Sequence, residues 1–160
     1  MEEKIYRLLY PMKVTLVTSV SEEGKPNIVT LAWNCPVSQN PPMVAFCITP
    51  KRYSYELISK TKEFVVNIPP PELKEQALTC GRNSGRDMDK FAETGLTPEK
   101  AELVKPPLIK ECPVSIECKL VKTVETGDHV IVIGEAVKVH KIKEGAKGLY
   151  HLGGDEFTEA

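Results

Sequence analysis

Short runs of apolar and β-branched residues, separated by clusters of turn-forming residues, dominate the first half of the chain. Such runs are typical of β-strands. They predict strands over residues 12–20, 27–33, 43–48 and 63–68, with a loop over 34–42. The run 43–48 (MVAFCI) has no polar position, which indicates a strand buried on both faces.

Helical patterns are short and lie between these strands and a second β region. Ser54 can cap a helix over 54–60, and a second helix over 72–80 would end at Gly81. Residues 82–90 predict a polar loop, 91–95 a helical turn, and Thr97-Pro98-Glu99 the start of another helix.

Apolar and polar residues alternate strictly from Val114 to Leu120, which predicts a strand with one solvated face. A turn over 125–128 precedes a long strand over 129–139, in which Gly134 marks a bulge or a close backbone approach. Residues 145–154 predict irregular structure. Several closely spaced strands with few helices indicate a mainly β barrel or sandwich, and the 160 residues suit one domain over 1–160.

Composition excludes several classes of protein. The 21 basic and 22 acidic side chains give a net charge of −1, which argues against a nucleic-acid binder. No apolar run approaches the length of a membrane span, and the first four residues do not resemble a signal peptide. Five cysteines without a CxxC pair favour reduced thiols in the cytoplasm, and the three histidines lack metal-ligand spacing, so we expect no metal site.

The common nucleotide and hydrolase motifs are absent from the sequence, which leaves two polar segments as candidate anion sites. Lys51, Arg52 and Ser54 stand at a predicted helix start, where free N–H groups attract phosphate; the alternative is a solvated basic turn with an ordinary cap. In the loop 83–90, Arg86 and Lys90 could contact an anion and Gly85 permits close backbone approach. The alternative for this loop is a polar connection in which Asp87 caps a short helix.

Two further features could contact a flat ring or a proton. In the segment 30–35 (TLAWNC), small residues beside Trp33 could frame a ring, or Trp33 is simply a large core residue. His129, at the mouth of the longest strand, could exchange a proton near neutral pH, or it is an ordinary surface histidine.

Taken in order, several segments resemble the flavin reductase-like family, the FMN-binding split barrels, and especially its flavoredoxin-type members. The resemblance runs from about residue 8 to residue 154. It rests on TLVTS (15–19), GKPN (24–27), TLAW (30–33), NPPMVA (40–45), KRYSYELI (51–58), EFVVNIP (63–69), CGRNSGRDMDKF (80–91), ECP (111–113), EC (117–118), GDH (127–129) and GE (134–135).

The resemblance implies a six-stranded Greek-key split β-barrel with short inserted helices, which works as a homodimer and binds FMN without a covalent bond. By this resemblance the isoalloxazine would be lined by Thr30, Leu31, Ala32, Trp33, Asn34 and Cys35. The phosphate would be held by Lys51, Arg52 and Ser54, and covered by Ser84, Gly85, Arg86 and Lys90. Asn67 would brace the site. His129 would face the flavin or the incoming reductant as the catalytic residue. Phe157 stands where many relatives have a tyrosine, so no hydroxyl is expected there.

The expected function is that of an FMN-binding oxidoreductase, with NADH or NADPH as co-substrate and a flavin, a ferric complex or a redox protein as acceptor. The alternative is an electron-carrier flavoprotein without its own NAD(P)H site. A third reading, a barrel without flavin used as a binding module, leaves Lys51, Arg52, Ser54 and the loop 84–90 without a role.

Overall fold

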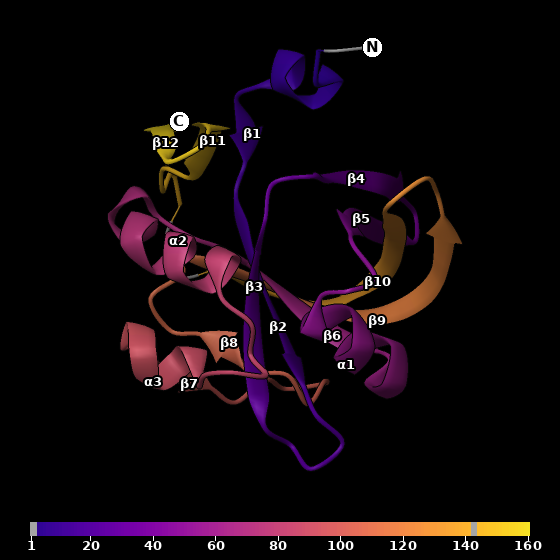
Figure 1. Ribbon diagram of the computed structural model, residues 1–160. Coiled ribbons are helices and arrows are strands. Elements are labelled where there is room, and N and C mark those ends of the chain that lie inside the picture. Colours follow the sequence, from indigo (N-terminus) through magenta and orange to yellow (C-terminus); the bar gives the residue numbers. More distant parts are fainter. Residues whose placement is uncertain (1–2, 142–143) are drawn as a thin grey trace.

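A computed structural model describes residues 3–141 and 144–160, and a single antiparallel sheet organises it (Figure 1). Its order is β3-β2-β6-β9-β10-β5-β4. The seven strands are β2 (Thr15–Val20), β3 (Pro26–Leu31), β4 (Asn34–Gln39), β5 (Pro42–Ile48), β6 (Glu63–Ile68), β9 (Val114–Glu125) and β10 (Val130–Lys141). The expectation of a mainly β chain is therefore confirmed.

The two edge strands of this sheet are neighbours in the sequence. β3 pairs with β2 and β4 pairs with β5, yet only Ala32 and Trp33 separate β3 from β4. The loop expected over 34–42 is wrong, because β4 is exposed and owes its pairing to backbone hydrogen bonds with β5 rather than to an apolar face. β3 and β4 are thus one stretch of chain that is interrupted at Ala32 and Trp33, and the sheet has seven strands where six were expected.

Helices and small sheets cover the main sheet. The helical elements are η1 (Ile5–Leu9), α1 (Tyr53–Thr61), η2 (Pro71–Leu73), α2 (Lys74–Arg82) and α3 (Lys90–Thr94). β1 (Met12–Lys13), β11 (Leu149–Gly153) and β12 (Glu156–Glu159) form one small sheet, and β7 (Pro98–Glu99) pairs with β8 (Leu108–Ile109). The helix start expected at Thr97 is wrong, because β7 pairs there with β8. The irregular structure expected over 145–154 is confirmed for residues 145–148 and wrong for β11, which acquires strand geometry only through distant partners.

The helix ends differ from the expected caps. Ser54 does not cap α1: the N-cap is Arg52, and Ser54 is a buried residue of the first turn. Gly81 lies inside α2, which continues to Arg82. Asp89 rather than Asp87 caps α3, by accepting a hydrogen bond from the Ala92 backbone N–H at 3.1 Å.

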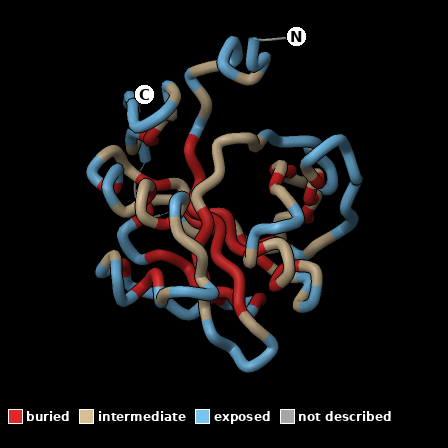
Figure 2. The backbone as a smooth tube through the Cα atoms, in the orientation of Figure 1, coloured by how far each residue is buried: buried red, intermediate tan, exposed pale blue. Residues whose placement is uncertain are grey.

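Three apolar clusters hold the layers together. The first lies within the curved sheet and includes Phe46 and Phe64, and the second lies between β2 or β3 and α2, α3 and the C-terminal strands. The third joins Val65 of β6 to Ala101, Val104 and Leu108. The central strands are buried and the outer parts of β4 and β9 are exposed (Figure 2). Gly134 confirms the expected close approach: the ladder shifts register there, and a Cβ would lie 2.3 Å from Phe64 Cζ.

Among the helices that the structure describes, none is long and apolar enough to cross a membrane. Met1 and Glu2, on which the expectation of no signal peptide partly depends, lie outside the described residues.

Candidate functional site

A polar pocket of about 150 Å³ lies where the start of β3, the turn before α1, the end of α2 and the loop 83–90 meet. We call it the basic pocket. It is lined by Asn27, Val29, Lys51, Arg52, Tyr53, Ser54, Arg82, Asn83, Ser84, Gly85 and Lys90. Six residues expected at the phosphate are thus brought together from segments far apart in the sequence.

The lining of the basic pocket carries four cationic side chains: Lys51, Arg52, Arg82 and Lys90. No aspartate or glutamate stands among these lining residues. Such an imbalance is unusual in a chain whose net charge is −1, and it creates a strongly positive local field. The pocket is therefore suited to an anion.

Lys90 forms the buried part of this charge. Its side chain donates hydrogen bonds of 2.7 Å to the carbonyls of Ile28 and Cys80, and the residue is only 3% exposed. Burial lowers the pKa of Lys90 to about 8, and the nearby Arg52 contributes in the same direction. The thiol of Cys80 opposes this effect.

A tightly packed trio shapes the neutral wall of the basic pocket. The buried Asn27 donates from Nδ2 to Ser54 Oγ at 3.0 Å. Gly85 packs directly on the Asn27 side chain, so that a Cβ there would lie 2.2 Å from Asn27 Oδ1. Only a glycine leaves the loop 83–90 this close to β3.

A more apolar pocket of about 220 Å³ adjoins the basic pocket, and we call it the ring pocket. It is lined by Val14, Thr30, Ala32, Ala77, Leu78, Gly81, Arg82, His151, Gly154 and Phe157. Arg82 lines both pockets, and Arg52 Nη1 donates to the Gly81 carbonyl at 2.9 Å. The end of α2 therefore joins the two pockets.

The C-terminal hairpin, β11 and β12, forms the outer wall of the ring pocket. Arg82 forms an ion pair with Asp155 in the turn of this hairpin. The ring of Phe157 packs against His151, and the Lys74 ammonium lies 5.9 Å from its centroid. The contacts of Arg82 and Lys74 hold the hairpin against α2.

Only two of the six expected ring contacts, Thr30 and Ala32, line the ring pocket. Leu31 packs on the core within the curved sheet, and Trp33 stacks on His129. Asn34 and Cys35 line a separate apolar hollow of about 190 Å³. The segment 30–35 therefore contributes to the ring pocket before the break between β3 and β4, and to a different hollow after it.

Two other expected cofactor contacts lie outside both pockets. Asn67 is fully buried and is bonded to Leu16, Ile109 and Ser115, so it braces the core. Arg86 pairs with Glu56 at 2.7 Å and stacks over Tyr53, which lines the basic pocket. Arg86 thus supports the rim instead of facing an anion.

His129 belongs to an aromatic stack beside these pockets. Its ring lies 4.5 Å from that of Trp33 at an interplanar angle of 25°, and Tyr6 contacts the other ring of the pair. His129 Nδ1 lies 2.6 Å from Asp128 Oδ1, and this hydrogen bond lowers the pKa of Asp128. His129 also lines an open hollow of about 560 Å³, which shares Lys51 with the basic pocket.

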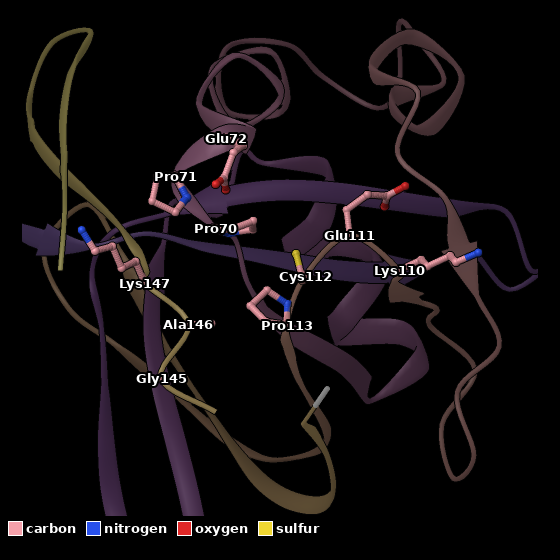
Figure 3. Close-up of a pocket in the computed structure, with 10 residues that line it drawn as sticks. All are labelled: Pro70, Pro71, Glu72, Lys110, Glu111, Cys112, Pro113, Gly145, Ala146 and Lys147. Carbon is pink, nitrogen blue, oxygen red and sulfur yellow. The ribbon is translucent and has the colours of Figure 1, made fainter. Parts of the chain in front are cut away.

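A cavity of about 450 Å³ elsewhere shows the contrast with the basic pocket (Figure 3). Lys110 and Lys147 line it, but so do Glu72 and Glu111. Glu111 accepts hydrogen bonds from Thr97, and Lys147 pairs with Glu159. The lining of this cavity thus carries carboxylates beside its lysines, whereas the lining of the basic pocket carries cations alone.

The sequence argument missed Arg82, Asn27 and Phe157 as pocket residues. Arg82 and Asn27 stand in matching motifs, but nothing local to either motif indicates that both reach one pocket. The one local signal for Arg82 is its position at the end of a helix, directly before a polar loop that contains glycine.

Comparison with known proteins identifies the family of this chain. The family model described as "Flavin reductase like domain" matches residues 6–158. A flavin reductase from Pseudomonas putida is 33% identical over 146 residues, covering 91% of this chain and 82% of the relative.

Two solved structures have the same fold. Flavoredoxin from Methanosarcina acetivorans superposes with a TM-score of 0.88 at 27% identity, over 100% of this chain and 90% of that one. An FMN-binding protein from Thermus thermophilus, with bound 1-cyclohex-2-enone, superposes with a TM-score of 0.85 at 25% identity, over 94% and 86%. The family model and the flavin reductase relative lead to one conclusion: the chain belongs to the flavin reductase-like domain family.

Proposed function

We propose that the protein is an FMN-binding oxidoreductase, with the FMN phosphate in the basic pocket and the isoalloxazine in the ring pocket. The observation that carries this proposal is the set of four cations without a carboxylate in the lining of the basic pocket. The likeness to a flavin reductase and to an FMN-binding protein supports the choice of ligand.

The residues present fit FMN. A phosphate monoester needs a small, cationic, hydrogen-bonding site, and Arg side chains suit its oxygens. The basic pocket offers this in about 150 Å³, with Gly85 leaving room that a Cβ would fill. The ring pocket offers apolar walls from Val14, Ala77 and Phe157 for a flat ring.

Bound FMN supplies hydride and single-electron transfer, and the chain supplies binding and orientation. Lys51, Arg52 and Arg82 would neutralise the phosphate charge, and Thr30 and Ala32 would contact the ring. His129, held by Asp128 and by its stack on Trp33, lines the open hollow beside Lys51. We assign that hollow to the NADH or NADPH donor and His129 to its orientation.

Removal of the phosphate contacts tests the binding mode. We expect Lys51→Ala with Arg52→Ala to weaken FMN binding at least about tenfold, because two charge-assisted contacts are lost. Riboflavin, which lacks the phosphate, should bind the natural protein more weakly than FMN does. Its affinity should be the same for the natural protein and for the double variant. Quenching of flavin fluorescence measures each affinity.

The matched control replaces two exposed lysines that do not line the pocket, Lys100→Ala with Lys122→Ala, which change net charge equally. Equal affinity of the natural protein for FMN and riboflavin would contradict the assignment of the basic pocket.

The visible spectrum under anaerobic conditions tests the reaction. A flavin reductase with its own donor site loses its flavin absorbance on addition of NADH or NADPH. A flavin that is bleached by dithionite but by neither nicotinamide would instead indicate an electron carrier served by a protein donor.

We propose further that the sheet, with β3 and β4 counted as one interrupted strand, closes as the six-stranded split barrel of the family and that two copies associate. The order that places β3 and β4 at opposite edges supports closure, because one stretch of chain forms both edges. Exposed Val37, Val121 and Val124 on β4 and β9 support association, since they form apolar surface on the described part of the chain.

A further inference from the structure

Lys90 is a buried cation whose hydrogen bonds are made but whose charge is not balanced. The two carbonyls of Ile28 and Cys80 satisfy two of its three N–H donors. Neither carbonyl carries a net charge. Among the ion pairs of the described residues, none includes Lys90.

Burial of an ammonium without a countercharge is costly, so buried lysines are normally paired or lose their proton. Lys90 also lines the basic pocket, where the remaining charged groups are Lys51, Arg52 and Arg82. Arg52 adds repulsion, and neither Lys51 nor Arg82 supplies negative charge. An anion in the basic pocket would therefore be the missing countercharge.

The other titratable groups near Lys90 do not supply it. On α2, Cys80 faces Lys90, and burial raises the pKa of its thiol to about 11, so it is neutral at ordinary pH. On β3, Asn27 and Ile28 carry no charge. Of the acids nearest in sequence, Asp89 is exposed and caps α3, and Glu93 is exposed on the same helix.

We propose that Lys90 is the proton-linked cation of the basic pocket: above neutral pH, a dianionic phosphate monoester binds there together with one proton taken up by the Lys90 amine. The inference rests on the proposed function only for the identity of the ligand as FMN. It makes Lys90 a positioning residue that senses pH through its own charge.

The direction of the effect follows from linkage. Without ligand the pKa of Lys90 is lowered to about 8, chiefly by burial. A nearby dianion favours the charged amine and raises that pKa. Below about pH 8 the amine is protonated in both states and affinity is steady. Above it the free protein must gain a proton to bind, so affinity falls as the pH rises.

Titration of the natural protein with FMN between pH 7 and pH 9.5 tests the proposal, with riboflavin titrated in parallel. Linkage to one group of pKa about 8 predicts a fall in FMN affinity of up to about 30-fold over this range. Riboflavin affinity stays nearly constant, which also corrects for any change in the ring or the fold. Cys80 does not titrate in this range.

Calorimetry in two buffers of different ionisation enthalpy measures the proton directly. We expect uptake of about half a proton per FMN at pH 8 and almost none at pH 6.5 to 7 from Lys90. Identical pH profiles for FMN and riboflavin, with no proton uptake at pH 8, would overturn the inference while leaving FMN binding intact.

Variants separate charge from packing. Lys90→Arg keeps the charge at every pH, so its FMN affinity becomes independent of pH above 8. Lys90→Met removes the charge, so its FMN affinity is low and also flat. Circular dichroism establishes that each variant is folded, and the titration of the natural protein stands if neither is.

Inorganic phosphate as a second probe distinguishes the two proposals. Binding of phosphate with proton uptake at pH 8, in a protein that does not bind FMN, would support the role of Lys90 and overturn the proposed flavin site. Binding of neither ligand between pH 7 and pH 9.5 would overturn both.

Discussion

At the scale of single residues, the basic pocket depends on what is absent as much as on what is present. Gly85 lets the loop 83–90 touch Asn27, and the lining carries cations without acids. The sequence pointed to Lys51, Arg52 and Ser54 because adjacent charges before a helix are a local pattern. Arg82 and Asn27 could not be found in this way, because their proximity arises only when α2 packs on β3.

Gly85→Ala is expected to weaken FMN binding about tenfold or more. The added methyl must displace the Asn27 amide, which would separate Asn27 from Ser54 and open the pocket wall. Fluorescence titration with FMN measures the change. Gly127→Ala is the matched control, because its Cβ would meet no atom within 4 Å; equal losses in both variants would contradict the argument.

At the scale of elements, alternation predicted β9 and a long apolar run predicted β10, but neither pattern indicated the contacts of β9 with the surrounding loops. Glu117 in β9 is fully buried and accepts hydrogen bonds from the backbone N–H groups of Glu102, Leu103 and Val104, and from His140 at 2.6 Å. Alternation marked Glu117 as a solvated position. A charged side chain turned inward became favourable only because the loop 102–104 folds over it.

Glu117→Gln is expected to destabilise the protein by about 3 kcal/mol, because backbone donors lose their charged acceptor. Urea unfolding measures this, and Glu125→Gln at the exposed end of the same strand is the control. A loss no larger than that of the control would show that the loop does not depend on this carboxylate.

The difference in stability between the natural protein and Glu117→Gln should depend on pH. Burial by itself raises the pKa of Glu117, but hydrogen bonds from Glu102, His140 and Leu103 outweigh it and hold the pKa below its ordinary value. The stabilisation is thus fully present above about pH 4.5 and is lost as the pH falls through the lowered pKa. We expect the difference in stability between the natural protein and Glu117→Gln to shrink below about pH 4; a constant difference would contradict this.

At the scale of the whole molecule, the ring pocket combines Val14, the end of β3, α2 and the last strands of the chain. Val14 and Phe157 line the same wall although almost the entire sequence separates them. The positions of most strands along the chain and the mainly β class were predictable from hydrophobic patterns. The C-terminal hairpin was not, because β11 obtains its partners from β1 and β12 and has little pattern of its own.

Phe157→Ala is expected to weaken FMN and riboflavin binding by a similar factor of about three to ten, since it removes apolar surface from the ring site only. This signature differs from that of Lys51 and Arg52, whose loss affects FMN alone. Leu152→Ala in the same hairpin is the control, because that side chain is already 40% exposed. A selective loss of FMN in Phe157→Ala would place the phosphate, not the ring, beside the hairpin.

Association of two copies is tested by light scattering after gel filtration. We expect a dimer at micromolar concentration and a monomer for Val121→Asp with Val124→Asp, because charges would replace exposed apolar side chains of β9. Val139→Asp, at another exposed apolar site, is the control. A natural protein that elutes as a monomer would contradict the proposed association.

The sharing of the α2 terminus by both pockets has a thermodynamic consequence. Arg82 lines each of them, and Arg52 is tied to Gly81 between them, so their spacing is fixed before any ligand arrives. Two sites held at a fixed distance act on a joined ligand as a chelate, because capture of one end gives the other a high effective concentration. Riboflavin and inorganic phosphate supplied together therefore cannot substitute for FMN, even though they carry the same two recognised groups.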